Sequence, residues 1–411
     1  MSGPLGQLRV LELSRVLAGP WAGQVLADFG AEVIKVEQPG AGDSTRSWGP
    51  PWVRDPDGAP LDAAYFHATN RGKRSVVLDL KHPRGLELAR GLAARSDVVL
   101  ENFRVGTAAR LGLGWEDLSA LNPGLIYCSI SGFGQDGPRA RDPAYDIMIQ
   151  AMGGLMSVTG LPEGAPGAGP MKVGVAIADL MTGMYAVSAI LAALHWRERT
   201  GQGQHIDLAL LDTQVAWLAN QSMNYLVGGT PPGRFGNANP NIVPYQAFAT
   251  TDGHVLLAVG TDGQFRALCL EAGLEALSDD PRFATNPARV AHREALIELL
   301  TPAFAGRPAQ AWLEALARVG VPCGPVNDLA AVFADPQVVH RGLRLDLPHP
   351  LAGTVPSVAN PVRFGATPVE HGAAGPPLGW HTDEVLTELL GLGPEQLDGL
   401  RHGGVIGGAR P

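Results

Sequence analysis

Cysteine and charge are both scarce in this sequence. Its 411 residues include only three cysteines, Cys128, Cys269 and Cys323, and no CxxC or Cys/His spacing surrounds them. Neither a disulfide framework nor a zinc site is expected, and a reducing cytoplasm suits such a chain. Charged residues make up 17% of the sequence, and the net charge is −9. A protein of negative net charge repels nucleic acid, so we expect no nucleic-acid partner.

Several motifs that are typical of particular enzyme classes are also absent. No GxGxxG fingerprint follows the first predicted strand, which argues against an NAD(P)-dependent oxidoreductase. The sequence has neither the GxSxG of many hydrolases nor an HExxH metal motif. The N-terminus lacks a basic stretch followed by an apolar core, so no secretion signal is expected. The longest apolar run, residues 180–196, is slightly short for a membrane span and predicts a core helix, with no membrane as partner.

Strands and helices alternate along the first part of the chain. Short apolar runs predict strands at residues 8–13, 31–37, 75–80, 97–101 and 125–131, with helices at 19–29 and 83–94. This alternation is typical of an α/β, doubly wound (Rossmann-like) domain, in which ligands bind beyond the carboxyl ends of the strands.

The pattern changes at about residue 225. A hairpin is expected at residues 245–250 and 254–259, followed by helices at 263–272, 289–304 and 308–319. We therefore predict a large α/β domain over residues 1–224 and a smaller α+β domain over residues 225–328. Residues 329–411 are expected to return to the large domain.

One acid stands out in an apolar stretch. Between Gly164 and Leu194 the only charged residues are Lys172 and Asp179. An isolated charge among apolar neighbours is costly, so a carboxylate there needs a reason. Asp179 falls near the start of the helix predicted at residues 180–196. Its carboxylate could cap that helix, which the local pattern favours, or act as a nucleophile, and one position can serve both purposes.

Cations and an amide occur at or after the ends of predicted strands. Lys73, Arg104 and Arg110 could bind phosphate groups, although any single such cation is more often a solvated surface charge. Asn102 and Phe103 directly follow a predicted buried strand. They could place an amide and a ring against an adenine, or they could form an ordinary turn around a core phenylalanine.

A set of segments, ordered along nearly the whole chain, shares a pattern with one enzyme family. The segments are RVLELSRVLAGPWAGQVLADFGAEVIKVEQP, GDSTR, NRGKRSVVLDLK, DVVLENFRVG, LNPGLIYCSISGFGQDGP, YDIMIQAMGG, ADLMTGMYAVSAILAAL, TGQGQHIDLALLD and LGWHTDEVLTELLGL. Together they resemble the family III CoA-transferases, the CaiB/BaiF-like group that includes formyl-CoA transferase and carnitine CoA-transferase. Each segment alone is weak, but the ordered set is specific.

The resemblance implies a fold, a site and a reaction. It implies a doubly wound domain with a small domain, in an interlocked homodimer of two intertwined chains. It implies that the Asp179 carboxylate attacks an acyl-CoA thioester and that the acyl group and coenzyme A then exchange through anhydride and thioester intermediates. No metal or other cofactor is required, because coenzyme A enters as the substrate. The residues expected at the coenzyme A site are Arg15, Val16, Leu17, Ala18, Lys73, Asn102, Phe103, Arg104, Arg110 and Asp146.

Departures from the family pattern bear on the substrates. Formyl-CoA transferases carry Gln at the position of Leu17 and a glycine run near residues 236–241, where this chain reads GNANPN. Formate or oxalate specificity is therefore not indicated, and succinyl-CoA is the first donor to consider. The related α-methylacyl-CoA racemases carry His at the position of Tyr145, so the chemistry favours CoA transfer to an acceptor carboxylic acid over racemisation. The remaining alternative is a non-catalytic CoA-binding protein, which would be indifferent to Asp179→Ala.

Overall fold

Residue contacts divide the chain into two compact units. The computed structural model describes residues 3–408. The first unit runs to Leu155 and also contains Val173–Ser222 and the chain from Pro336 onward, whereas the second consists of Met156–Lys172 and Met223–Asp335. Each unit has a hydrophobic core of its own.

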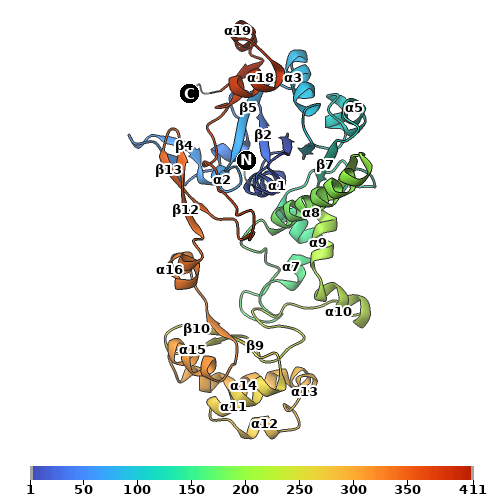
Figure 1. Cartoon of the computed structure of the whole chain (residues 1–411). Coiled ribbons are helices and arrows are strands. Elements are labelled where there is room, and N and C mark those ends of the chain that lie inside the picture. Colours follow the sequence, from blue (N-terminus) through green and yellow to red (C-terminus); the bar gives the residue numbers. More distant parts are fainter. Residues whose placement is uncertain (1–2, 409–411) are drawn as a thin grey trace. The chain divides into compact units, whose positions relative to one another are not determined.

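A seven-stranded sheet forms the centre of the first unit (Figure 1). In spatial order its strands are β14 (Ile406–Gly407), β5 (Lys73–Leu78), β2 (Glu32–Glu37), β1 (Arg9–Glu12), β6 (Val98–Glu101), β7 (Ile126–Ser131) and β8 (Gln204–Ala209). All neighbouring strands are parallel except β14, which pairs antiparallel with β5. The chain starts at β1, adds β2 and β5 on one side, and then adds β6, β7 and β8 on the other. The point between β1 and β6 is therefore the topological switch point, where open α/β sheets bind ligands.

Helices cover both faces of this sheet because successive strand residues point to opposite sides. Val10 and Leu100 belong to a core cluster with α1 (Ala18–Asp28) and α8 (Ile177–Thr200). Leu11 and Val99 belong to a second cluster, which contains residues of α3 (Pro83–Ala93), α5 (Trp115–Leu121), α18 (Thr382–Leu390) and α19 (Pro394–His402). The predicted α/β architecture with a mainly parallel sheet is confirmed.

The helix that bears Asp179 is long and apolar. Its last turn holds Arg197 and Arg199, and Gly201 ends it in the left-handed conformation, with φ 73°. Gly183 allows α8 to approach α1 closely, because a Cβ atom there would lie 2.7 Å from the Ala18 carbonyl oxygen. By length and composition α8 could cross a membrane. In this unit it instead packs against α1, β7 and β8.

Shorter elements complete the first unit. They are the hairpins β3 (Trp52–Arg54) with β4 (Pro60–Ala63) and β12 (Arg344–His349) with β13 (Gly353–Val358), together with η1 (Ser44–Ser47), α2 (Ala64–His67), α4 (Thr107–Arg110), α6 (Asp146–Met152), α9 (Leu210–Trp217) and α17 (Pro336–His340). The chain passes between the units within α7 (Leu155–Val158) and α10 (Asn220–Gly228).

The second unit is a small α+β structure. Its antiparallel sheet has the order β11 (Cys323–Pro325), β10 (His254–Ala258) and β9 (Tyr245–Ala249), so the predicted hairpin is present. The helices are α11 (Asp262–Glu271), α12 (Ala276–Asp279), α13 (Asn286–Ala291), α14 (Arg293–Ala305), α15 (Ala309–Arg318) and α16 (Leu329–Ala334).

The contacts group residues 156–172 with this unit, whereas the sequence-based division placed them in the large domain. A backbone bond of 2.9 Å from the Gly236 N–H to the Gly160 carbonyl joins the two parts of the second unit. Such long-range pairing of a loop rich in Gly, Pro and Ala leaves no periodic signal in the sequence.

Candidate active site

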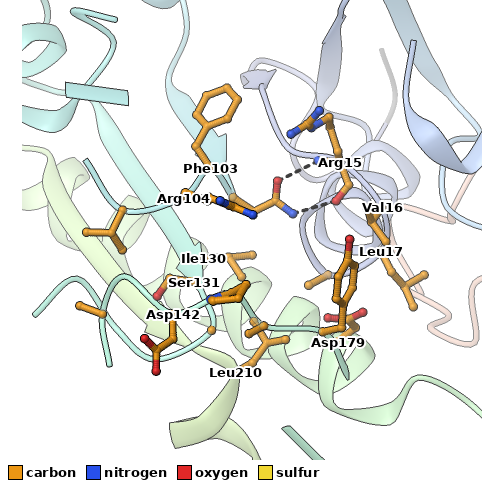
Figure 2. Close-up of a pocket in the computed structure, with 18 of the residues that line it drawn as sticks. Arg15, Val16, Leu17, Phe103, Arg104, Ile130, Ser131, Asp142, Asp179 and Leu210 are labelled. Atoms are coloured by element: carbon orange, nitrogen blue, oxygen red, sulfur yellow. Dashed lines mark hydrogen bonds between the residues drawn. The ribbon is translucent and has the colours of Figure 1, made fainter. Parts of the chain in front are cut away.

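A pocket of about 330 Å³ lies at the switch point of the sheet. It is formed by the segments that follow β1, β6 and β7, by the start of α9, and by the first turn of α8 (Figure 2). Its lining residues are Arg15, Val16, Leu17, Ala18, Ser44, Asn102, Phe103, Arg104, Val105, Ile130, Ser131, Gly132, Ala140, Arg141, Asp142, Pro143, Ala144, Tyr145, Asp179 and Leu210. All of them belong to the first unit, so the pocket is complete within one compact body.

The segment after β1 is held in a strained conformation at the pocket. Val16 has φ 72°, which is unusual for any residue with a side chain and more so for a β-branched one. The Asp43 carboxylate accepts the Val16 N–H, at 3.3 Å to Oδ1 and 3.2 Å to Oδ2. Asp43 is itself held by Lys35, whose Nζ lies 3.0 Å from Oδ2. Such strain persists only where surrounding contacts maintain it, and it is concentrated at functional sites.

Asn102 ties the segment after β6 to the segment after β1. Its Oδ1 accepts the Arg15 N–H at 2.9 Å, and its Nδ2 donates to the Arg15 carbonyl at 2.7 Å. These are the two dashed lines in Figure 2. The Asn102 amide therefore joins the segment after β6 to the segment after β1, and side chains of both segments line the pocket. Arg15 and Arg104, both exposed, are cations of this wall.

Asp179 lies in the first turn of α8 but does not cap that helix. The N-cap is Ala176, and Asp179 is the third helical residue. Within residues 3–408 the structure gives the Asp179 carboxylate no hydrogen-bond donor and no cation, although the side chain is only partly exposed. Figure 2 shows it close to Val16 and Leu17 at the floor of the pocket. The prediction that Asp179 caps the helix is therefore wrong. Capping does not explain why a carboxylate is placed among apolar residues here.

Burial and a neighbouring charge both act on this carboxylate. Burial, and after it the negative charge of Asp146, raise the pKa of Asp179 from 3.8 to about 7. Both effects disfavour the charged form, and a more basic carboxylate is also a better nucleophile. Burial, and next the charge of Asp179, also raise the pKa of Tyr65, which places that phenol within electrostatic range of the acid.

Asp146 is the residue that caps α8. Its Oδ1 accepts the N–H groups of Ala178 at 2.8 Å and Asp179 at 3.2 Å, and its Oδ2 accepts from Gln150 Nε2 at 2.6 Å. Asp146 is not one of the residues that line the pocket, and its carboxylate fixes the backbone that carries Asp179. A contact of Asp146 with coenzyme A stays a prediction.

Two predicted coenzyme ligands lie off the pocket lining. Lys73 is fully buried, and its Nζ contacts Glu12 Oε2 at 2.8 Å, the Pro20 carbonyl at 2.8 Å and Asn70 Oδ1 at 3.0 Å. An ammonium with three protein partners has none left for a phosphate, so Lys73 is revised to a structural residue. Arg110 is exposed on α4, where Nη2 donates to Thr107 Oγ1 at 2.9 Å.

The pocket also contains a segment that the sequence did not mark. Residues 140–145 supply one wall, including Arg141, Asp142 and Tyr145. Tyr145 stands out in the sequence only as a departure from the racemases. Arg141 had no signal beyond its place in a loop between β7 and α6, because nothing in a single sequence reports how a loop folds back over a sheet.

The family model of the CoA-transferase family III matches residues 5–382. The chain belongs to CoA-transferase family III. It is 54% identical over 386 residues to the succinate–glutarate CoA-transferase of Agrobacterium fabrum (strain C58), covering 94% of this chain and 96% of that one. It is 41% identical over 403 residues to the succinyl-CoA:glutarate CoA-transferase of Homo sapiens, covering 98% and 90%.

The comparison with solved structures gives the same family. A crystal structure of a CAIB/BAIF family protein from Brucella suis superposes with a TM-score of 0.83 at 50% identity, covering 95% of this chain and 100% of that one. The predictions of family and of CoA-transferase activity are thus confirmed. The racemase alternative is not favoured by these family III relatives.

Proposed function

We propose that this family III enzyme moves coenzyme A from an acyl-CoA to a carboxylic acid through covalent intermediates on Asp179. The observation that carries the proposal is the Asp179 carboxylate itself. It is partly buried at the floor of the switch-point pocket, without a hydrogen-bond donor or a cation among residues 3–408, and with a pKa raised by burial and by Asp146. A carboxylate that only stabilised the fold would have a partner.

The proposed reaction needs only the Asp179 carboxylate, the acyl-CoA and the acceptor acid. An oxygen of ionised Asp179 attacks the thioester carbonyl and the C–S bond breaks, which releases coenzyme A as the thiolate and leaves a mixed anhydride of the donor acid and Asp179. The thiolate then attacks the aspartyl carbonyl, releasing the donor acid and leaving an aspartyl-CoA thioester. The acceptor carboxylate displaces the thiolate to form a second anhydride, and the thiolate attacks its acyl carbonyl to give the product and free Asp179. Covalent catalysis of this kind divides one difficult exchange into easier steps, and no metal or redox cofactor enters the scheme.

The pocket wall supplies the binding groups in this scheme. We assign the phosphates of coenzyme A to the exposed guanidinium groups of Arg15 and Arg104, and a ring contact to Phe103. The backbone of residues 16–18 lines the same pocket as Asp179 and would face the reacting carbonyl. Positioning a nucleophile and a carbonyl in one site accounts for a large part of catalysis in such exchanges.

We further propose that donor and acceptor are short dicarboxylates. The two curated relatives above are named for succinate and glutarate. With Arg15 and Arg104 assigned to the phosphates of coenzyme A, Arg141 is a further cation of the pocket lining and can pair with a second carboxylate. The test is a panel of acceptors with succinyl-CoA as donor. Glutarate should be a better acceptor than pentanoate, which has the same chain length and one carboxylate. Equal rates for the two acids would overturn the dicarboxylate proposal.

We also propose that the enzyme is a cytoplasmic homodimer with intertwined chains. The support is an apolar face of α8, where Met184, Tyr185 and Trp196 are each more than a third exposed. Beside Met184 lies a mainly apolar cavity of about 740 Å³, lined also by Trp21 and Trp52. An uncovered apolar surface of this kind marks an interface, and a second copy is the simplest occupant. Light scattering after gel filtration should give twice the chain mass, in the absence of membrane or nucleic acid.

A further inference from the structure

A polar row crosses three strands beside the pocket and is not used by the mechanism. Glu101 on β6 is in register with Ser129 on β7, and Ser129 is in register with Asp207 on β8. Register partners project from the same face of a sheet. Glu101 and Ser129 are 4% and 2% exposed. Burying two polar side chains has a cost in stability, so their contacts need an explanation.

These side chains form a polar chain that ends at the pocket wall. The Phe103 N–H donates to Glu101 Oε2 at 2.7 Å. Ser129 is the register partner of Glu101 on β7, and its hydroxyl favours the ionised carboxylate, partly offsetting the burial that raises the pKa of Glu101. The Oγ of Ser129 lies 2.9 Å from His205 Nε2. A hydroxyl has one proton to donate. When Ser129 donates to ionised Glu101, it must accept from His205, and the imidazole then carries its proton on Nε2.

The outer end of this chain is held by aromatic packing. The His205 ring stacks on Trp115, with 6.1 Å between ring centroids and 13° between planes, and its edge meets Tyr127 at 5.6 Å. Tyr127 is fixed in turn, because its hydroxyl donates to the Leu113 carbonyl at 2.8 Å. His205 is an exposed residue, yet its ring has a defined orientation toward Ser129.

The inner end has no cation. Within residues 3–408 no Lys or Arg pairs with Glu101, and burial raises its pKa to about 7. The donors that the structure gives it are the Ser129 hydroxyl and the Phe103 N–H. Its contacts therefore serve the backbone directly after β6, where Asn102 joins the Arg15 segment and Phe103 and Arg104 line the pocket.

We propose that His205, Ser129 and Glu101 form a positioning relay that holds residues 102–105 in the conformation that receives coenzyme A. The inference rests on the proposed function, since it takes coenzyme A as the ligand of this pocket. The three residues are positioning residues: none lines the pocket, and each acts through the Phe103 N–H. Loss of the relay should weaken binding of coenzyme A while the chemistry on Asp179 continues at saturation.

The test compares two buried serines, Ser129 on β7 and Ser96 in the segment before β6. Ser129→Ala should raise the dissociation constant of coenzyme A, measured by titration calorimetry, and the KM for succinyl-CoA by roughly 5- to 10-fold, with kcat within about twofold. Ser96→Ala is the matched control. Ser96 is also 2% exposed, and its hydroxyl donates to the Leu92 carbonyl at 2.9 Å, at the other end of β6. It should lower the melting temperature to a similar degree and leave both constants unchanged.

Three further substitutions separate positioning from stability. His205→Phe keeps an aromatic ring against Trp115 but removes the donor, so it should reproduce the effect of Ser129→Ala. Glu101→Gln keeps an oxygen for the Phe103 N–H and should bind coenzyme A better than Glu101→Leu, which keeps none. Equal affinities for Ser129→Ala, His205→Phe and Ser96→Ala would overturn the relay. A wild-type enzyme that bound no coenzyme A would instead refute the proposed function, whatever the variants did.

Discussion

Replacing Asp179 with Asn should stabilise the folded protein, and the gain should depend on pH. The pKa of Asp179 is raised from 3.8 to about 7, first by burial and then by the charge of Asp146. The folded state therefore holds a proton that the unfolded state has lost between about pH 4 and pH 7. Stability contributed by the neutral acid is complete below about pH 4 and is lost as the pH rises through about 7.

The size of this effect follows from the same shift. The full difference in pKa corresponds to about 4 kcal/mol. Asp179 is only partly buried, so water retained near the carboxylate reduces the cost, and we expect about 1–2 kcal/mol at pH 8. Asn cannot ionise, so Asp179→Asn should be close to wild type near pH 4 and more stable above pH 7.

The assay is urea unfolding of wild type and Asp179→Asn at several values between pH 4.5 and 8.5, at one protein concentration. Asp212→Asn is a matched control. Asp212 is also in the first turn of its helix, α9, but its side chain is exposed, so removing its charge should not stabilise the fold. Parallel pH profiles for Asp179→Asn and wild type would refute the claim that the folded protein disfavours the charged carboxylate.

Four other substitutions test how the site is held. Asp146→Asn keeps an oxygen to cap α8 but removes the negative charge beside Asp179. The acidic limb of the kcat/KM profile, expected near pH 7 from the pKa of Asp179, should therefore move down by up to about 1 pH unit. A limb that did not move would contradict the assignment of that limb to Asp179. Val16→Gly should raise the free energy of unfolding by roughly 0.5–1 kcal/mol while lowering kcat/KM, because glycine accepts φ 72° without strain. Destabilisation of that variant would show that the Val16 side chain outweighs the strain. Lys73→Met should cost about 1–3 kcal/mol of stability, because it leaves Glu12 Oε2 buried without a partner while Lys35 still pairs with Oε1. Arg104→Ala should instead raise the KM for acyl-CoA with little change in melting temperature. The reverse pattern would restore Lys73 as a coenzyme ligand.

Much of the first unit could be predicted from local sequence. The strand at Val98–Glu101 and the helix at Pro83–Ala93 agree with the expected ranges to within a residue, because apolar runs and caps report them directly. The isolation of Asp179 among apolar residues also singled out the position that the structure places in the pocket. The local sequence could not show that a residue other than Asp179 caps α8. The capping side chain is Asp146, which lies 33 positions before Asp179.

Long-range side-chain partners explain the remaining differences. Lys73 looked like a phosphate ligand because it is a cation at a strand, and only the fold shows that Glu12 neutralises it. Residues 156–172 looked like a loop of the large domain, and only their pairing with the strand-free segment around Gly236 groups them with the second unit. Neither fact leaves a local pattern in a single sequence.

A covalent intermediate on Asp179 can be detected on one tryptic peptide. Trypsin cleavage after Lys172 and Arg197 releases residues 173–197, in which Asp179 is the only acidic residue. The enzyme is incubated with succinyl-CoA, quenched with neutral hydroxylamine, and digested for mass spectrometry. We expect a hydroxamate on this peptide in wild type and none without the acyl-CoA or in Asp179→Asn. Turnover of succinyl-CoA and glutarate with residues 173–197 unmodified would contradict a covalent intermediate on Asp179.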